Sequence, residues 1–148
     1  MDASVEKPRE NWYDSFPGRG IVYDLSFRAL SAPDNEGRLR AVVALGKSGD
    51  PRAVRPLADL VADHDPAIRR GAIAALGELK SGRPVEILIE RLRDKSEQAD
   101  IRRLAAETLA AIRSTGALHG LRKFSADAGE DSDLREFVAG LLAHLDIL

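Results

Sequence analysis

An internal repeat constrains the fold of this chain more than any other feature of its sequence. Four ten-residue segments align, and they begin at Gly37, Ile68, Ile101 and Leu134, at offsets of 31, 33 and 33 residues. Arginine recurs at the second position of the segment, as Arg38, Arg69, Arg102 and Arg135. Leucine recurs at the ninth position, as Leu45, Leu76, Leu109 and Leu142. The apolar residues of each segment follow a spacing of three to four, which predicts one stripe of an amphipathic helix.

A second helix is predicted after the first in most units. The run that starts at Ala53-Val54 matches the run that starts at Pro84-Val85, again at an offset of 31 residues. A third copy from Ala117 is degraded, and the fourth unit holds only its first helix. Each unit is therefore a helical hairpin that cannot bury its own apolar face, and stacking of the units buries it. We expect an all-α chain with about 3.5 repeats, over 37–67, 68–100, 101–133 and 134–148.

Turn and capping residues agree with this division. The pairs Asp50-Pro51 and Asp65-Pro66 place proline at helix starts, where its missing N–H group is not needed. Gly49 lies where a hairpin must turn. Asp133, with Glu136 three residues later, predicts a capping box for the last helix.

The N-terminal residues do not fit the repeat. Residues 1–19 are polar and irregular, and we interpret them as an arm that carries Trp12, Tyr13 and Phe16. Residues 20–36 predict a capping helix and a turn, which close the exposed end of the first repeat. The three aromatic residues of the arm either fold back over the first hairpin as an apolar lid or clasp a partner.

The repeat resembles the HEAT-like repeats of the phycobilisome-lyase (PBS lyase) type. The residues that carry the resemblance are Ala44-Leu45-Gly46, the turn Gly49-Asp50-Pro51 and the run Ala53-Val54-Arg55-Pro56-Leu57. The resemblance covers about residues 37 to 148. It implies a short right-handed α-solenoid whose second helices line a concave face, and a family that mostly supplies interaction scaffolds. A fold alone does not determine function.

The column of four arginines has two interpretations. A positive charge in the first turn of a helix opposes the helix dipole, so a partner should offset it. We favour a structural ladder, in which each guanidinium pairs with an inter-repeat carboxylate such as Asp63, Asp65, Asp94, Asp100 or Asp133. The alternative is a row that binds anions.

The face of the second helices is the expected docking surface. Its predicted non-core residues are Arg55, Asp59, Glu86, Ile89, Glu90 and Arg93. Ile89 is apolar where the preceding unit has Ala58, so we expect its side chain to be exposed. A groove along such a face could reach about 800 Å² of interface per partner. The alternative is a solvated helix face without a ligand.

Composition excludes several classes of function. The formal net charge is −2, from 22 basic and 24 acidic residues, so we expect no nucleic-acid or membrane partner. The chain has no cysteine, and therefore no disulfide or thiolate metal site. The N-terminus has no apolar core of a signal peptide, and no run of 18 apolar residues occurs, so we expect a cytoplasmic protein.

No catalytic, metal-binding or cofactor-binding constellation stands out. The three histidines, His64, His119 and His144, are not spaced as ligands on one helix face. HEAT-like di-iron hydroxylases use His-Glu pairs, and no His-Glu dipeptide occurs here. The sequence therefore favours a non-enzymatic scaffold that docks a protein partner, without a cofactor. The alternatives are a bilin-lyase-like subunit and a self-associating structural protein that forms a homo-oligomer.

Overall fold

The computed structural model describes residues 19–146, and the arm residues Trp12, Tyr13 and Phe16 lie outside this range. The described chain forms eight α-helices and one short 3₁₀ turn, η2 (Pro51–Ala53), with no strand. The expected all-α fold is thereby confirmed. The helices are α1 (Arg19–Ser31), α2 (Asn35–Lys47), α3 (Val54–Leu60), α4 (Pro66–Leu79), α5 (Val85–Arg93), α6 (Ala99–Ile112), α7 (Thr115–Ala126) and α8 (Ser132–Asp146).

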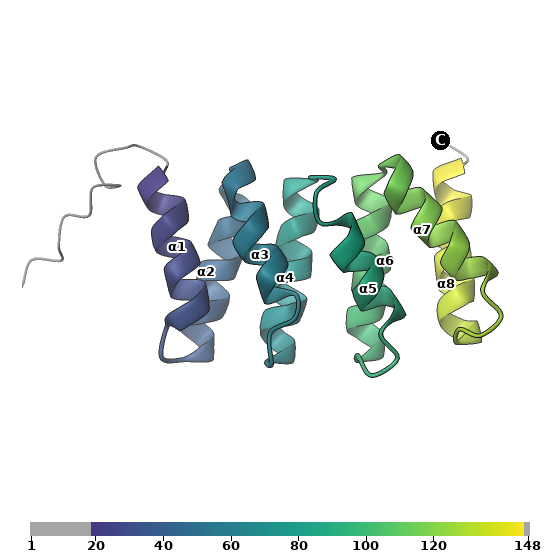
Figure 1. Cartoon of the computed structure of the whole chain (residues 1–148), viewed down its shortest axis with the longest axis horizontal. Helices are drawn as coiled ribbons and strands as arrows, with labels where there is room; N and C mark the ends of the chain where they lie inside the picture. The colour runs from purple at the N-terminus through teal and green to yellow at the C-terminus, as the bar shows by residue number, and fades with distance from the viewer. Residues whose placement is uncertain (1–18, 147–148) are drawn as a thin grey trace, which may run out of the picture.

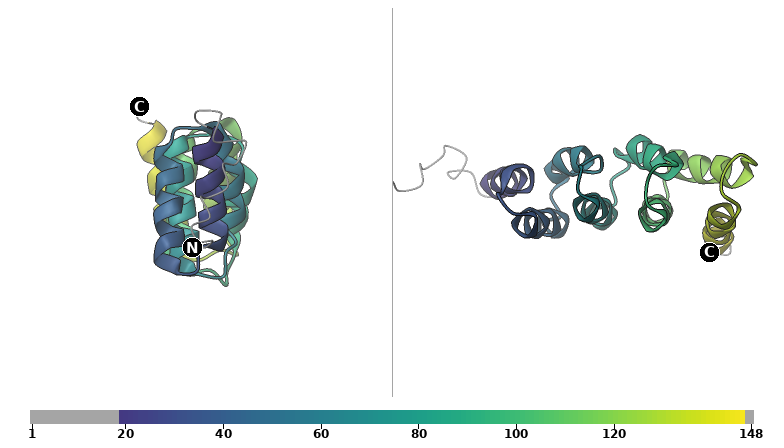
Figure 2. Two further views of the ribbon diagram at one scale, coloured as in Figure 1. Left: turned by 90° about the vertical axis from the view of Figure 1, so that its left-hand side faces the viewer. Right: turned by 90° about the horizontal axis from the view of Figure 1, so that it is seen from below.

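The helices are arranged in two parallel rows (Figures 1 and 2). Helices α2, α4, α6 and α8 form one row, in which each packs on the next. Helices α1, α3, α5 and α7 form the other row, which is at the front in Figure 1. We call these the first-helix row and the second-helix row. The chain alternates between the rows, and helices that follow one another in the sequence run antiparallel (Figure 1).

The core lies between the two rows and follows the repeat. Leu45, Leu76 and Leu109, at the ninth position of the first three repeat segments, are fully buried, as expected for one stripe of each first helix. Leu57, Leu88 and Leu121 of the second helices are also fully buried, and so is Phe124 of α7. Burial of one leucine side chain contributes about 1.5–3 kcal/mol, so these repeated positions each stabilise the stack.

The first-helix row is packed closely through small residues. A Cβ atom added to Gly46 of α2 would lie 2.7 Å from the Cβ of Ala75 in α4. A Cβ atom on Gly71 of α4 would lie 2.7 Å from a methyl group of Leu39 in α2. The second helices instead pack mainly on the first helices. The stack therefore has a closely packed side and a more open side.

The curvature expected for the second-helix row is slight in this chain. Figure 2 shows both rows running almost straight along the long axis of the molecule. The second helices accordingly form a nearly flat surface in place of the expected concave one. Superhelical curvature accumulates from a small rotation at each repeat, and about 3.5 repeats add too few rotations to curve the row strongly.

Most helix starts follow the sequence signals, with one shift. The Asp50 and Asp65 side chains accept hydrogen bonds from the backbone N–H groups of Arg52 and Ala67, at 2.9 and 2.7 Å. Helix α8 begins earlier than the predicted capping box requires. The side chain of Asp131 accepts from the N–H of Leu134 at 3.0 Å, so Asp131 takes the capping position predicted for Asp133.

Candidate protein-docking surface

The four column arginines occupy the fourth residue of α2, α4, α6 and α8. Arg38 forms an ion pair with Asp63, Arg69 with Glu97, and Arg102 with Glu130. Arg135 donates to the backbone carbonyl of Ser125 instead, at 3.3 Å. Each carboxylate comes from the loop that follows the next second helix, so each ion pair joins neighbouring parts of the stack.

Glu97 is the centre of this ladder. Its carboxylate accepts two hydrogen bonds from the guanidinium of Arg69, at 2.8 and 2.9 Å, and one from the N–H of Gln98 at 2.9 Å. Arg91 of α5 also donates to it, at 3.3 Å. The side chain of Glu97 is only 1% exposed, so its charge is removed from solvent and satisfied within the protein. The three ion pairs therefore join neighbouring parts of the stack and leave Arg38, Arg69 and Arg102 little capacity for an outside anion.

The pKa values of the ladder carboxyls report the same arrangement. Burial raises the pKa of Glu97, but hydrogen bonds from Arg69 and from the N–H of Gln98 lower it by more, and the pKa lies below its ordinary value. The pKa of Asp63 is also lowered, because the hydrogen bonds from Arg38 and from the N–H of Asp65 outweigh the effect of burial. Both carboxyls are therefore ionised at neutral pH.

Two of the ladder partners were missed by sequence reasoning. The expected carboxylates included Asp63, which pairs with Arg38, but they did not include Glu97 and Glu130. Asp100 instead pairs with Arg70, on the exposed side of the first-helix row. The repeat itself held the signal, because Asp63, Glu97 and Glu130 follow one another at 34 and 33 residues.

The acidic loop before α8 is engaged internally. Glu130 pairs with Arg102, and Asp131 caps α8. Asp127 accepts a hydrogen bond from the N–H of Gly129 at 2.9 Å and lies 3.7 Å from Arg93. In the described part of the chain, no group of three or more His, Cys, Asp or Glu side chains could hold a metal ion.

The second-helix row carries charges of a different kind. Arg55 and Asp59 of α3 and Glu86 and Glu90 of α5 are exposed. Within residues 19–146, none of these four side chains forms an ion pair or side-chain hydrogen bond. The charges that face outward from α3 and α5 are therefore available to a partner.

Two predicted members of this surface are placed differently. Arg93 is partly buried and lies 3.7 Å from Asp127. Ile89 is half-buried, because its side chain fills the space beside Gly120 of α7, where a Cβ atom would lie 2.5 Å from it. The expectation that Ile89 is exposed is therefore wrong, and its role includes the packing of α5 on α7.

An apolar stripe on α1 extends the second-helix row. Val22 and Ala29 of α1 are buried, whereas Tyr23, Phe27 and Leu30 are 54%, 62% and 56% exposed. Their spacing of i, i+4 and i+7 places these three residues on one side of the helix. Sequence reasoning assigned α1 only a capping role. The available signal was that α1 has apolar residues on all its sides, whereas packing on one neighbouring helix needs them on one side only.

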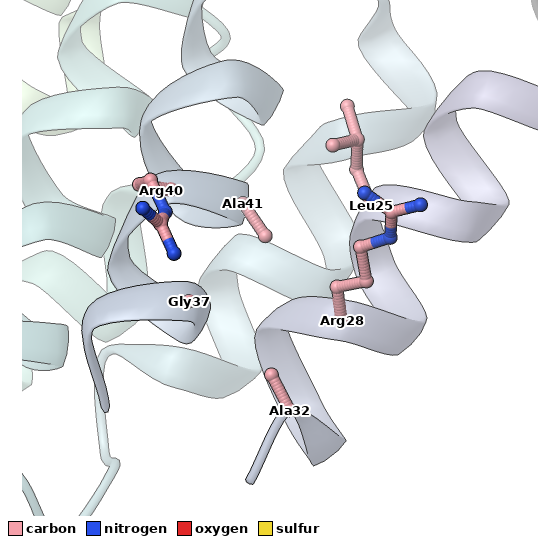
Figure 3. Close-up of a pocket in the computed structure, with 6 residues that line it drawn as sticks. All are labelled: Leu25, Arg28, Ala32, Gly37, Arg40 and Ala41. Atoms are coloured by element: carbon pink, nitrogen blue, oxygen red, sulfur yellow. The ribbon is translucent and has the colours of Figure 1, made fainter. Parts of the chain in front are cut away.

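Two grooves lie near these surfaces. The first, about 330 Å³, lies between α1 and α2 and is drawn in Figure 3. One side is lined by Leu25 and Arg28 of α1 and by Ala32, which follows this helix, and the other side is lined by Gly37, Arg40 and Ala41 of α2. The second, about 480 Å³, lies between the start of α3 and the loop that leads into α5.

Among the helices of residues 19–146, none combines the length and the apolar composition that a membrane span requires.

Comparisons with known proteins agree with this architecture. Residues 25–99 match the family described as HEAT repeats. No curated protein matches the sequence. The fold is similar to that of human deoxyhypusine hydroxylase, with a TM-score of 0.78 and 21% identity over 92% of this chain and 47% of that chain. It is also similar to a crystal structure of an engineered protein, with a TM-score of 0.54 and 22% identity over 84% of this chain and 62% of that one.

These likenesses concern the fold. The chain spans about half the length of the hydroxylase, and an identity of 21% shows a shared architecture only. The two rows of helices and the family match together confirm the predicted α-solenoid.

Proposed function

This chain belongs to the HEAT repeat family, and from that premise we propose that it is a non-enzymatic module that docks a protein partner on its second-helix row. HEAT repeats generally mediate protein interactions. The observation that carries the proposal is a contrast between two sets of charged side chains, those of the ladder and those of the second-helix row. The charges of Arg38, Arg69 and Arg102 are paired inside the protein. In contrast, Arg55, Asp59, Glu86 and Glu90 are exposed and form no intramolecular ion pair in the described chain.

The exposed aromatic stripe of α1 supports the same surface. Aromatic side chains are enriched at the centres of protein interfaces, where they are surrounded by polar residues. Phe27 is 62% exposed on a helix of the same row as the charged helices α3 and α5. An apolar anchor beside a set of unpaired charges is the composition that a docking surface requires.

The test is a pair of charge-reversal variants with equal changes in net charge. Glu86→Lys with Glu90→Lys alters the second-helix row, and Glu78→Lys with Glu107→Lys alters exposed positions of α4 and α6 in the first-helix row. Both baits are used to capture proteins from a lysate of the source cells, and bound proteins are identified by mass spectrometry. We expect a partner that the wild type and the first-helix variant retain and the second-helix variant loses.

The melting temperatures of both variants should match that of the wild type, because all four residues are exposed. Equal loss of the partner in both variants would assign the effect to net charge and contradict the proposal. A fall in melting temperature confined to the second-helix variant would assign Glu86 and Glu90 a structural role. A partner that proves to be a second copy of the chain would favour the self-associating alternative.

We also propose that the repeats are of the phycobilisome-lyase type. The proposal is supported by the phrases Ala44-Leu45-Gly46 and Gly49-Asp50-Pro51, which stand at the end of α2 and at the turn into α3. In the structure Gly46 allows the close contact with Ala75, and Gly49 has a φ of +65°, which glycine adopts without strain. Both glycines of these phrases therefore have a structural reason to be present.

A further inference from the structure

We propose that the groove between α3 and α5 binds an acidic segment of the partner protein, with Arg55 and Arg83 as the two groups that hold its carboxylates. This inference rests on the proposed docking function and assigns one part of the second-helix row to one chemistry. The groove has a volume of about 480 Å³ and lies between the start of α3 and the residues that precede α5. Figure 1 shows these two helices side by side in the front row.

The charge of the groove comes from three arginines, of which two are available. Arg52 is held by Asp50, with its Nε donating to the carboxylate at 3.0 and 3.2 Å. The pKa of Asp50 is lowered by these side-chain hydrogen bonds, so this pair is charged and internally neutral. Arg55 and Arg83 are exposed and line the same groove. Their guanidinium groups have no ion pair or hydrogen bond within residues 19–146.

The floor of the groove is apolar. It is formed by Pro51, Val54, Ala58 and Pro84. A bound segment that covers this apolar floor displaces water from it, which strengthens the attraction between a guanidinium and a carboxylate beside it. The volume is in the range of sites that bury a ligand, and it admits an apolar side chain next to the carboxylate. A segment that alternates acidic and apolar residues matches both features.

The start of α5 adds to the positive potential. Its N-terminal capping position is Pro84, which has no side-chain hydrogen-bond acceptor for the N–H groups of the first turn. These N–H groups carry the positive end of the helix dipole. The helix end is not a site by itself, and Glu86 in its first turn offsets part of this potential, so the two arginines remain the groups that hold the carboxylates.

The surroundings of the groove favour a peptide over a nucleic acid. Glu86 and Glu90 continue along α5 and do not line the groove. They would repel a polyanion that extended beyond it. A peptide can place carboxylates at Arg55 and Arg83 and a neutral or basic residue opposite the two glutamates. The bound peptide therefore needs acidic residues only where it contacts the groove.

The experiment selects ligands without assuming the partner. A library of random twelve-residue peptides is displayed on phage and panned against the purified full chain, and the enriched peptides are synthesised with a fluorescent label. Anisotropy titrations compare the wild type with Arg55→Glu/Arg83→Glu, and with Arg40→Glu/Lys123→Glu as a control of equal charge at exposed positions outside the groove. A third variant, Ala58→Gln, fills the floor without changing charge.

We expect enriched peptides with an excess of Asp and Glu beside apolar residues. We expect the Arg55/Arg83 variant to weaken their binding at least about tenfold, because two charge-assisted hydrogen-bonding groups are lost. Ala58→Gln should also weaken binding, and the control variant should bind as the wild type does. Binding should weaken as salt is raised, as expected for exposed charges.

Several outcomes would overturn the inference. They are the absence of any enriched peptide, enriched peptides with no acidic excess, and equal binding by the Arg55/Arg83 variant and the wild type. A wild-type chain that sediments as a dimer, and as a monomer once Arg55 and Arg83 are reversed, would assign the groove to a second copy. Peptides that bind the Arg55/Arg83 variant as tightly as the wild type, but bind Glu86→Lys/Glu90→Lys more weakly, would contradict the proposed role of the groove. They would still support docking on the second-helix row. If neither the Arg55/Arg83 variant nor Glu86→Lys/Glu90→Lys weakens peptide binding, both the groove and the docking face are contradicted.

Discussion

At the scale of single residues, Glu97 connects three parts of the stack. It follows α5, accepts two hydrogen bonds from Arg69 of α4, and receives a further one from Arg91 of α5. Because its side chain is 1% exposed, water cannot replace these bonds when they are lost. Asp63 and Glu130 have equivalent partners in Arg38 and Arg102, so the same interaction repeats along one edge of the molecule.

The lowered pKa values of Glu97 and Asp63 predict a loss of stability in acid. A carboxyl whose pKa is lower in the folded chain stabilises the fold fully above its unfolded value, near 4 for these groups, and loses this contribution as the pH falls through the folded value. We expect Glu97→Gln to lower the free energy of unfolding by about 2–4 kcal/mol at pH 7, because it leaves the partly buried Arg69 without its partner charge. Urea unfolding from pH 7 to pH 2 measures both effects.

The difference between Glu97→Gln and the wild type should narrow as the pH falls, since acid removes the same charge from the wild type. Glu90→Gln is the control, because Glu90 is exposed and forms no ion pair in the described chain. A difference between Glu97→Gln and the wild type that is constant over this pH range would assign the role of Glu97 to packing and contradict an electrostatic one.

At the scale of helices, the first-helix row depends on how closely α2 and α4 approach. Gly46 and Ala75 are in contact across this interface, with a distance of 2.8 Å from a Cβ placed on Gly46 to the Cα of Ala75. The neighbour in the way is backbone and a methyl group, and neither can rotate aside. In the second-helix row, Gly120 of α7 is as closely approached, but its neighbour is the flexible end of the Ile89 side chain.

Two glycine substitutions should therefore have opposite effects. Gly46→Ala inserts a methyl group into the α2–α4 contact and should destabilise the fold by about 1–3 kcal/mol. Gly140→Ala in α8 meets nothing within 4 Å and should stabilise the fold by about 0.5–1 kcal/mol, because alanine favours a helix more than glycine does. Thermal unfolding followed by circular dichroism measures both. A stabilised Gly46→Ala variant would show that the two helices can separate at little cost.

At the scale of the whole molecule, the two rows of helices have different roles. The first-helix row holds the stack together through close packing, the Arg70–Asp100 pair and the approach of Arg103 to the ring of Phe137, 5.3 Å from its centroid. The second-helix row presents α1, α3 and α5 with exposed apolar and charged side chains. A surface that contributes little to stacking can vary in sequence without loss of the fold, which suits it for recognition.

The α1 stripe provides a test at this scale. Phe27→Ser removes an exposed aromatic side chain, so we expect the free energy of unfolding to change by no more than about 0.5 kcal/mol. If α1 belongs to the docking surface, the same variant should weaken retention of a partner at least about fivefold, since aromatic anchors at interfaces contribute 1 kcal/mol or more. Quantitative capture beside a melting curve separates the two effects. Full retention of the partner would confine the docking surface to α3 and α5.

Sequence reasoning reached the fold more completely than the site. The repeat of Arg38, Arg69, Arg102 and Arg135 and of the buried leucines predicted the hairpins and their stacking, because stacked units must repeat their contacts at the same period. The expectation of ladder partners failed for Glu97 and Glu130, because loop length decides which carboxylate reaches the next arginine. The exposure of Ile89 was also wrong, because Gly120, on a different helix, leaves room for its side chain.

Patterns in the sequence were enough to predict the all-α class, the helical hairpins and the repeated leucines of the core. These follow from local spacing and capping, which depend on near neighbours along the chain. Three features depend on how the helices pack: the exposed apolar stripe of α1, the nearly flat second-helix row, and the groove that Arg55 and Arg83 share. Arg55 and Arg83 are 28 residues apart in sequence. Their proximity follows from the way α3 and α5 stack, which no local pattern specifies.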